Sequence, residues 1–575
     1  MNYKISYHHP NAQYIPIEVE FNVEKDNFVE LQFPVWRPGR YERGDFAKNV
    51  QRFKVVDDQN KSIDAFKITK DCWKVDCSKT KSIKVNYNYY AAELNAGSTF
   101  MDDQQLYMNP VNCLIYIKEQ QNDICTVQLD IPEDFEVACG KEFKNNKAEF
   151  ENYHELVDSP FIASPSLKHL AFDCKGVNFN LWFQGHVKLD EDKIIQDFTK
   201  FTQSQIEKFE GFPVKKYHYL FQILAEKAYH GVEHQTSTVI ALGPTYDLME
   251  SLYNDLLGVS SHELYHTWNV KALRPAEMYP YDYSQENYSR QGYVTEGVTT
   301  YMGDLFLVES GVKDWKWYKS ELETLLQRHF DNFGRFNYSV AQSSFDTWLD
   351  GYVSGAPNRK VSIYNEGAIL SFVIDLKIRT NSINKASLHD AMKELYETYA
   401  LANKGYTERE FQSVIEKYAD TDLSDFFAHY YYGTHSFETI VTEALEQIGF
   451  EISTESNLSY STRILGFKLT QTAGKTIVNT IYPGSSADLG GIALKDEIIS
   501  INGFKVNEDL DKWVSYFKDD QIYLTINRQG RILEITCPNT TKEYYPSYKL
   551  TKVKAPSNLQ KRIFKKWCSS DWDDV

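Results

Sequence analysis

The chain has 575 residues, of which 42% are apolar, so it is too long for one hydrophobic core and should divide into several domains. Its formal net charge is -18, with acidic and basic residues interspersed, which argues against the basic face that nucleic acid or an anionic membrane requires. No window approaches the roughly 18 apolar residues of a membrane span, so none is expected.

The N terminus and the cysteines bear on the cellular compartment. Residues Met1 to Lys4 open directly into alternating polar and apolar residues, which is not the pattern of a signal peptide. The eight cysteines show neither a C-x-x-C pair nor the framework of a small disulfide-bonded domain, so we interpret them as free thiols. Both features predict a cytoplasmic protein.

The first predicted domain spans residues 1–170 and is all-β, resembling a β-sandwich. Short alternations of apolar and aromatic residues run from Tyr3 to about Leu170, and turn signals such as Arg37-Pro38-Gly39 interrupt them. This pattern predicts a β domain in front of the rest of the chain.

The second predicted domain spans residues 171–455 and combines sheet with helix. Its first part, 171–243, has strand-like runs at Val177–Phe183 and Tyr217–Leu224, and between them a helical apolar period over Glu191–Glu210. From Asp247 onward the period stays helical, which predicts a mostly helical part over 244–455. The fold class expected for the whole chain is therefore multidomain α+β.

Two further regions follow the helical part. Gly449 and the polar run Ser453–Ser459 predict a linker, after which short strands resume around a helix-like segment, Leu510–Phe517, in a domain at residues 460–540. Lys-rich and then Asp-rich stretches predict that residues 541–575 form an appended C-terminal tail.

The segment His262-Glu263-Leu264-Tyr265-His266 has the pattern H-E-x-x-H. On a helix, positions i and i+4 share a face, so the two histidines can present ring nitrogens to one Zn²⁺ ion with Glu263 beside it. Zinc lowers the pKa of a bound water toward ~7, and Glu263 is then placed to take the proton as catalytic base. The alternative is a chance match on a surface helix.

A catalytic zinc needs a third protein ligand and an open position. Glu296, on a second predicted helix, would complete a site of two histidines and one glutamate. The alternative is a solvated carboxylate at a helix start, where the helix dipole favours negative charge. Asp304, two turns further along, is predicted to orient one histidine by accepting its other N–H.

Two more residues are candidates for substrate contacts. Glu233 lies between two strand-like runs, so it could lie along a cleft edge, pair with a free α-ammonium group and select N-terminal cleavage. Tyr364, which opens an apolar helix, could donate its hydroxyl hydrogen to the tetrahedral oxyanion. The alternatives are an ordinary polar contact for Glu233 and simple packing for Tyr364.

The zinc motif is part of a longer string, HELYHTWNVK from His262 to Lys271, which continues to Arg274-Pro275-Ala276-Glu277. This string resembles the glycyl aminopeptidases, zinc metallopeptidases of the thermolysin-like, gluzincin type, with a β domain in front and a PDZ domain behind. The resemblance implies one Zn²⁺ per chain, Glu296 as third ligand, and a small first substrate residue, glycine or alanine.

The resemblance extends to the substrate contacts. Gly231-Val232-Glu233-His234 stands where related zinc aminopeptidases have a G-x-x-E-N loop that binds the substrate amine, which implies Gly231 and Glu233 as substrate-binding residues. Tyr364 is similar to the transition-state tyrosine that precedes a Lys-Gly-Ala segment, although this chain continues Asn-Glu-Gly-Ala. The string Pro34 to Tyr41 also resembles the β domain of the family.

Residues 460–540 resemble a PDZ domain. Leu465-Gly466-Phe467 is similar to its carboxylate-binding loop, and the segments Tyr482 to Ala487 and Asp496 to Gly503 match its pattern. PDZ domains add an extended peptide as a strand and capture its C-terminal carboxylate, so a peptide C terminus is the partner that the resemblance implies.

The function predicted from the sequence is that of a zinc-dependent aminopeptidase that hydrolyses N-terminal residues from peptides. One rival is a zinc endopeptidase with the same metal site and no amine anchor. A second is a PDZ-based peptide-binding or scaffold protein with a vestigial zinc site, against which the presence of His262, Glu263, His266 and Glu296 argues.

Overall fold

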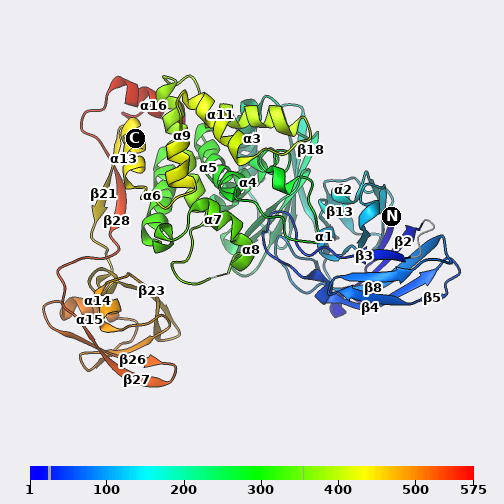
Figure 1. Ribbon diagram of the computed structural model, residues 1–575, viewed down its shortest axis with the longest axis horizontal. Coiled ribbons are helices and arrows are strands. Elements are labelled where there is room, and N and C mark those ends of the chain that lie inside the picture. Colours follow the sequence, from blue (N-terminus) through cyan, green and yellow to red (C-terminus); the bar gives the residue numbers. More distant parts are fainter. Residues whose placement is uncertain (24–27, 354) are drawn as a thin grey trace. The chain divides into compact units, whose positions relative to one another are not determined.

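The computed structural model describes residues 1–23, 28–353 and 355–575 (Figure 1). The chain forms two compact units: residues 1–318, 332–448 and 557–575 make up unit 1, and residues 319–331 and 449–556 make up unit 2. A β-rich N-terminal region precedes a mostly helical one, so the predicted multidomain α+β class is confirmed. Within the described residues, no helix combines the length and the apolar character needed to cross a lipid bilayer.

The N-terminal region of unit 1 consists of three sheets. A seven-stranded sheet has the order β14-β12-β1-β2-β8-β4-β5, and two four-stranded sheets have the orders β11-β3-β7-β6 and β13-β15-β10-β9. Side chains alternate between the two faces of each strand, as in β2, where Ile15, Ile17, Val19 and Phe21 are buried. The strands are β1 (Asn2–Ser6), β2 (Tyr14–Asn22), β3 (Phe28–Gln32), β4 (Val50–Asp57), β5 (Ser62–Ile63), β6 (Ala65–Thr69), β7 (Cys72–Asp76), β8 (Ser82–Tyr90), β9 (Phe100–Met101), β10 (Leu106–Met108), β11 (Tyr116–Ile117), β12 (Cys125–Asp130), β13 (Glu136–Cys139), β14 (Lys147–Phe150) and β15 (Phe161–Ser164), with the short helices α1 (Pro110–Cys113) and α2 (Tyr153–Val157).

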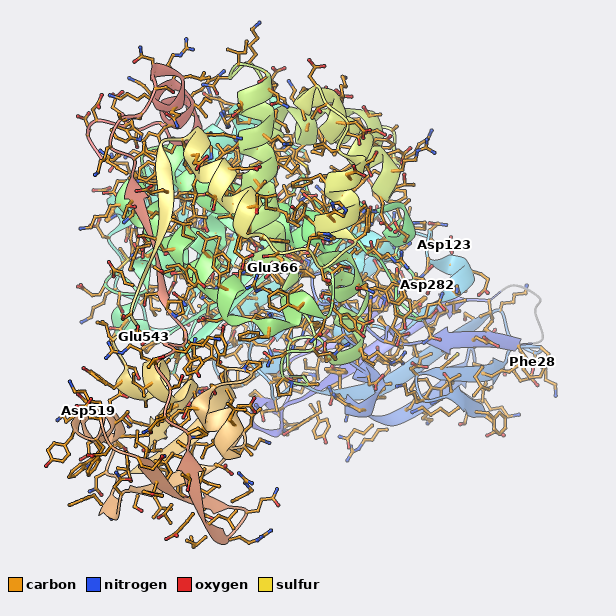
Figure 2. The ribbon with its side chains drawn as sticks, turned by 60° about the vertical axis from the view of Figure 1, so that its left-hand side comes forward. Phe28, Asp123, Asp282, Glu366, Asp519 and Glu543 are labelled. Carbon is orange, nitrogen blue, oxygen red and sulfur yellow. The ribbon has the colours of Figure 1, made fainter. Side chains whose placement is uncertain are left out.

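A segment from far along the chain completes the core of this region. Met278, Tyr281 and Tyr283 are buried in the same apolar cluster as the strands. The Val35 backbone N–H donates to the Tyr283 carbonyl (2.8 Å), and the Trp36 indole N–H donates to the carbonyl of Asp282 (2.7 Å), a residue labelled in Figure 2. The loop after β3 is thereby fixed to the segment that follows the zinc motif.

A five-stranded sheet comes next, with the order β16-β17-β18-β20-β19. β17, β18 and β20 run parallel, and β19 pairs antiparallel with β20 at one edge. The two predicted strands are confirmed as β17 and β18, and the predicted helix is confirmed as α3. The segment expected to separate two strands is itself a strand, β19, which ends at Glu233. The elements are β16 (Lys168–Cys174), β17 (Val177–Gln184), α3 (Glu191–Phe209), β18 (Lys216–Ile223), β19 (Ala228–Glu233) and β20 (Ser237–Gly243).

The helical part of unit 1 is built around α4, α5 and α9, which lie near one another in Figure 1. Glycines let these backbones approach closely: a Cβ on Gly303 of α5 would lie 2.9 Å from the His262 Cα, and one on Gly297 would lie 2.4 Å from the Gly367 Cα. The helices are α4 (Tyr253–Tyr265), the π-helix η6 (Tyr293–Val298), α5 (Thr299–Glu309), α6 (Trp315–Asp331, which continues into unit 2), α7 (Val340–Phe345), α8 (Thr347–Asp350), α9 (Ile363–Asn381), α10 (Leu388–Leu395), α11 (Glu408–Ala419), α12 (Ser424–Phe426) and α13 (Glu438–Gln447).

The last residues of the chain differ from the predicted tail. Residues 541–575 contain β28 (Ser547–Lys552), which pairs antiparallel with β21 (Phe450–Glu455), and α16 (Asn558–Cys568). The α16 residues Phe564 and Trp567 are fully buried, and the Trp567 indole N–H donates to the Tyr301 hydroxyl (2.8 Å). Charged residues dominate the composition here, yet the apolar ones recur at helical spacing and give α16 a buried face.

Most of unit 2 is a sheet with two helices. The strand order is β22-β23-β24-β26-β27, with β25 paired to β24, and the predicted helix at 510–517 is confirmed as α15. The elements are β22 (Phe467–Thr472), β23 (Lys475–Ile481), α14 (Ser486–Gly490), β24 (Glu497–Ile501), β25 (Phe504–Lys505), α15 (Leu510–Tyr516), β26 (Ile522–Arg528) and β27 (Arg531–Cys537).

Candidate active site

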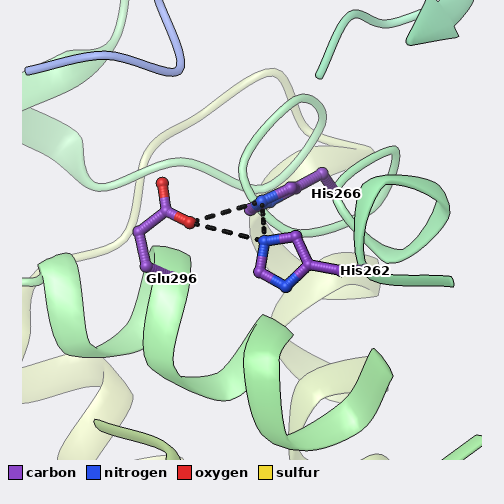
Figure 3. Close-up of side chains that lie close together, drawn as sticks. All are labelled: His262, His266 and Glu296. Atoms are coloured by element: carbon purple, nitrogen blue, oxygen red, sulfur yellow. Dashed lines mark hydrogen bonds and ion pairs between the residues drawn. The ribbon is translucent and has the colours of Figure 1, made fainter. Parts of the chain in front are cut away.

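The three residues predicted as zinc ligands lie together in unit 1 (Figure 3). The Nε2 atoms of His262 and His266 are 3.0 Å apart, and Oε2 of Glu296 lies 3.7 Å from the first and 3.4 Å from the second. Glu296 comes from the π-helix η6, in which every residue is buried. Two imidazole nitrogens and one carboxylate oxygen form the donor set of a catalytic zinc, so these residues fit that ion.

The ring of His266 is held by a residue that sequence reasoning missed. Nδ1 of His266 lies 2.8 Å from the Asn269 carbonyl, which can only accept, so Nδ1 carries a hydrogen and Nε2 is the nitrogen directed at Glu296. The Asn269 side chain donates to the Val294 carbonyl (2.9 Å) and to the Thr299 hydroxyl (3.1 Å), which joins the end of α4 to η6 and α5. Its place in the HELYHTWNVK string is the signal that points to it.

Asp304, predicted to orient a histidine, lies on α5, the helix whose Gly303 packs against His262. Its carboxylate acts on Tyr318, where burial first and Asp304 next raise the pKa of the phenol. A contact between Asp304 and one of the two zinc-motif histidines stays a prediction.

The electrostatics of the cluster favour a cation. Burial opposes ionisation of Glu296, yet the two histidines outweigh it and hold the pKa of its carboxyl at about 2. Burial likewise lowers the pKa of His266, but Glu296 and Glu233 outweigh it and raise the value to about 10. A group of carboxylates that holds a proton this strongly on an imidazole would release it to a metal ion, which replaces the proton as the balancing positive charge.

Glu263, the predicted base, belongs to a second cluster with Glu233 and His266, whose ligand atoms lie within 4.8 Å of one another. Burial raises the pKa of the Glu263 carboxyl well above its usual value, and the carboxylates of Glu233 and Glu296 raise it further. A carboxylate with a raised pKa accepts a proton readily at neutral pH, which is what a general base must do.

Gly231 permits this arrangement. A Cβ at position 231 would lie 2.1 Å from Oε1 of Glu263 and 2.9 Å from a methyl carbon of Val259, so no side chain fits between β19 and α4 here. The strand edge and the zinc-motif helix are therefore in direct contact at the residue expected to act as base.

Glu233 is the last residue of β19 and is only 3% exposed. Its Oε1 has no hydrogen-bond partner within the described part of the chain. A buried carboxylate oxygen without a donor costs free energy, so its presence beside Glu263 indicates a group that a cationic ligand can engage.

Tyr364 is the second residue of α9, and its ring centroid lies 6.5 Å from that of His262. Burial, with a contribution from Glu296, raises the pKa of its hydroxyl well above the usual value, so it remains protonated and able to donate. Its hydroxyl lies 3.4 Å from that of Tyr352, a neighbour that sequence reasoning did not identify.

A buried ion cluster, which the sequence analysis did not identify, connects two segments of the site. Asp158, at the end of α2, accepts from Lys271 Nζ (2.6 Å), and the same oxygen lies 3.2 Å from Nδ1 of His234. Its second oxygen accepts the Gln235 backbone N–H (2.8 Å). Burial opposes ionisation of Asp158, but Lys271 and His234 hold the pKa of its carboxyl well below the usual range. One carboxylate thus joins the end of β19, next to Glu233, to the string that follows the zinc motif.

The predicted carboxylate-binding loop, Leu465 to Phe467, lies in unit 2. Gly466 has φ +79°, and its carbonyl accepts the Tyr482 backbone N–H (2.7 Å). The side chains of Leu465 and Phe467 belong to the core of this sheet. A cavity of 440 Å³ lies beside β22 and the start of α15.

Two family models match parts of the chain. The Peptidase M61 N-terminal domain matches residues 2–165, and the M61 glycyl aminopeptidase matches residues 255–370, which contain His262, Glu263, His266, Glu296 and Tyr364. These matches support a protease. Both matches agree with the resemblance to the glycyl aminopeptidases that is found in the sequence.

Solved structures agree with the fold. An aminopeptidase N family protein from Idiomarina loihiensis superposes with a TM-score of 0.91 at 26% identity, over 99% of this chain and 100% of that one. An M1 zinc metallopeptidase from Deinococcus radiodurans, bound to a Tyr-Ser-Ala substrate, gives a TM-score of 0.47 at 12% identity over 76% of this chain and 94% of its own, too distant a likeness for further argument. Among curated proteins, none matches the chain by sequence.

Proposed function

We propose that the chain is a zinc-dependent aminopeptidase that hydrolyses N-terminal residues, glycine or alanine by preference, from peptides. The observation that supports this best is the position of Glu233, a buried carboxylate within 4.8 Å of both Glu263 and His266. A carboxylate at that place pairs with a free α-ammonium group, whereas an interior peptide segment offers no cation to it. The likeness to an aminopeptidase N family protein from Idiomarina loihiensis supports the same activity.

His262, His266 and Glu296 would hold one Zn²⁺, which when bound polarises a carbonyl oxygen and lowers the pKa of water. Glu233 binds the α-ammonium group, so that the first peptide carbonyl is placed beside Glu263. Glu263 takes a proton from the attacking water and donates it to the leaving amine. The Tyr364 hydroxyl donates a hydrogen bond to the oxyanion that develops on the carbonyl oxygen.

Gly231 contributes through its backbone. It lies on β19, which ends the sheet on this side, and residue 231 brings that edge against Glu263. An extended peptide can pair with the open edge of a strand, which would align the substrate backbone along the cleft.

Matched peptides that begin with alanine, with free and with acetylated N termini, test the proposal. Wild-type protein with zinc is expected to cleave only the free form, and the Glu263→Gln variant is expected to retain zinc and lose activity. Equal cleavage of both peptides would establish the endopeptidase alternative, and activity that survives in Glu263→Gln would exclude Glu263 as the base. A wild-type chain that binds peptides and cleaves none would favour the scaffold alternative.

We also propose that residues 460–540 form a PDZ domain that binds a peptide C terminus at Leu465 to Phe467. Support comes from the β22–β27 sheet, in which β22 is an edge strand, and from the cavity between β22 and α15. Fluorescence anisotropy with the full chain and peptides that end in a free carboxylate or an amide provides the test. Equal affinity for the two would contradict carboxylate capture. The domain limits 1–170, 171–455 and 460–540 and the cytoplasmic location stay predictions.

A further inference from the structure

The N-terminal β region reaches the candidate active site through the loop Arg37 to Tyr41. Gly39 has φ +82°, and a Cβ built on it would lie 2.4 Å from Oε2 of Glu233, so the loop backbone lies directly against that carboxylate. The loop is held in place by the hydrogen bonds of Val35 and Trp36 to the 282–283 segment. The Trp36 ring also packs edge-on against Trp348, with centroids 5.2 Å apart.

Tyr41, two residues further along, is 5% exposed and packs in the apolar core of the N-terminal region. Burial raises the pKa of its hydroxyl well above the usual value, and the carboxylates of Glu296 and Glu233 are the next contributors. A backbone hydrogen bond joins Tyr41 to the Tyr352 hydroxyl, which in turn lies 3.4 Å from that of Tyr364. Residue 41 therefore lies two positions from the backbone that contacts Glu233, and it is connected through Tyr352 to the oxyanion tyrosine.

The Tyr41 hydroxyl has no hydrogen-bond partner within the described residues. Four other buried tyrosines of the same region do find one, whereas the hydroxyl of Tyr116 has none in the part of the chain that the structure describes. Their hydroxyls donate to backbone carbonyls at 2.6–3.0 Å, as seen for Tyr3, Tyr87, Tyr107 and Tyr153. Simple core packing would leave Tyr41 with an unsatisfied buried hydroxyl, which is unfavourable.

We propose that Tyr41 is a substrate-binding residue whose hydroxyl oxygen accepts a hydrogen bond from the α-ammonium group of the first substrate residue, beside Glu233. An ammonium group has three N–H donors, so it can engage a carboxylate oxygen and a phenol oxygen at once. Glu233 Oε1 and the Tyr41 hydroxyl are both buried and without partner in the described chain. A single ammonium group bound between them would satisfy both. This inference rests on the proposed aminopeptidase function and assigns to the N-terminal β region a direct part in substrate binding.

The Tyr41→Phe variant tests the proposal because it removes only the hydroxyl. Its matched control is Tyr90→Phe, an exposed tyrosine on β8 of the same region. In assays with a peptide that begins with alanine, Tyr41→Phe is expected to raise KM on the order of ten-fold, the range of a hydrogen bond to a charged group, with kcat within about three-fold. If Tyr41 had a purely structural role, Tyr41→Phe would lower thermal stability or kcat, and KM would not rise at a nearly constant kcat.

Glycinamide, which has a free ammonium group, and N-acetylglycinamide, which has none, provide a second readout by calorimetry. Tyr41→Phe is expected to weaken glycinamide binding by a similar factor, and Tyr90→Phe to leave it unchanged. If the wild type cleaves no peptide, the proposed function fails, and the calorimetry still decides on Tyr41. Equal KM and equal glycinamide affinity in wild type and Tyr41→Phe, or no glycinamide binding by the wild type, would overturn the inference.

Discussion

Replacing Asp158 with Asn tests how the two halves of the site are joined. Lys271 has a side chain that is 1% exposed, and its Nζ contacts Asp158 at 2.6 Å. The amide keeps an oxygen for the Gln235 N–H and removes the charge, so an uncompensated ammonium is left buried. Loss of one partner of a buried ion pair costs about 3–5 kcal/mol, a large part of the roughly 5–15 kcal/mol that stabilises a domain.

Chemical denaturation followed by tryptophan fluorescence measures the loss, and the double variant Asp158→Asn with Lys271→Met is the control. The double variant is expected to recover part of the stability, because no buried charge remains unpaired. His234 next to Glu233 also loses its acceptor charge, so KM for peptides with a free N terminus is expected to rise in Asp158→Asn. A loss below about 0.5 kcal/mol, the size of an ordinary surface substitution, would refute the view that Asp158 compensates Lys271.

Three further predictions concern the site and its support. Gly231→Ala places a methyl group 2.1 Å from the position of Glu263 Oε1, so kcat is expected to fall on the order of a hundred-fold while zinc content stays at wild-type level; unchanged kcat would contradict the contact. Asn269→Ala removes the bonds that join the end of α4 to η6 and α5, so zinc affinity measured by chelator competition is expected to fall about 10–100-fold, and wild-type affinity would show that these bonds do not position the ligands. Glu309 has a pKa of about 2: burial opposes ionisation, but His389, Lys208 and Arg379 outweigh it. The ionised Glu309 carboxylate therefore stabilises the fold fully above the usual carboxyl pKa of 4.5, and this stabilisation is lost as pH falls toward 2. The free energy of unfolding of wild type should exceed that of Glu309→Gln by about 3 kcal/mol at pH 7, and the difference should shrink between pH 4.5 and 2. A difference that does not change with pH would contradict the role of Glu309.

Local patterns in the sequence predicted much of the fold and the centre of the site. His262 and His266 share a helix face because of their spacing, and α4 shows this arrangement. The helical period over Glu191–Glu210 and the strand pattern at Tyr217–Leu224 likewise depend on neighbouring residues, and α3 and β18 match them closely. Such elements can be predicted because the interactions that form them join residues that are close together in the sequence.

Contacts between distant parts of the chain were not predictable in the same way. Asp158 meets Lys271 across 113 positions, and Gly39 meets Glu233 only because the N-terminal region folds against β19. Strand β19 was missed because its side chains do not alternate clearly and a glycine interrupts it, and α16 because charged residues obscure its apolar face. Each of these contacts and elements depends on a distant segment of the chain, which local sequence patterns do not reveal.

Zinc-dependent aminopeptidase activity is tested most directly by the rate at which an alanine peptide with a free N terminus is hydrolysed as zinc is added back to chelator-treated protein. We expect the rate to rise to a plateau at one zinc per chain, while the acetylated peptide stays intact at every zinc concentration. A rate that does not depend on zinc, or equal cleavage of the acetylated peptide, would contradict this activity.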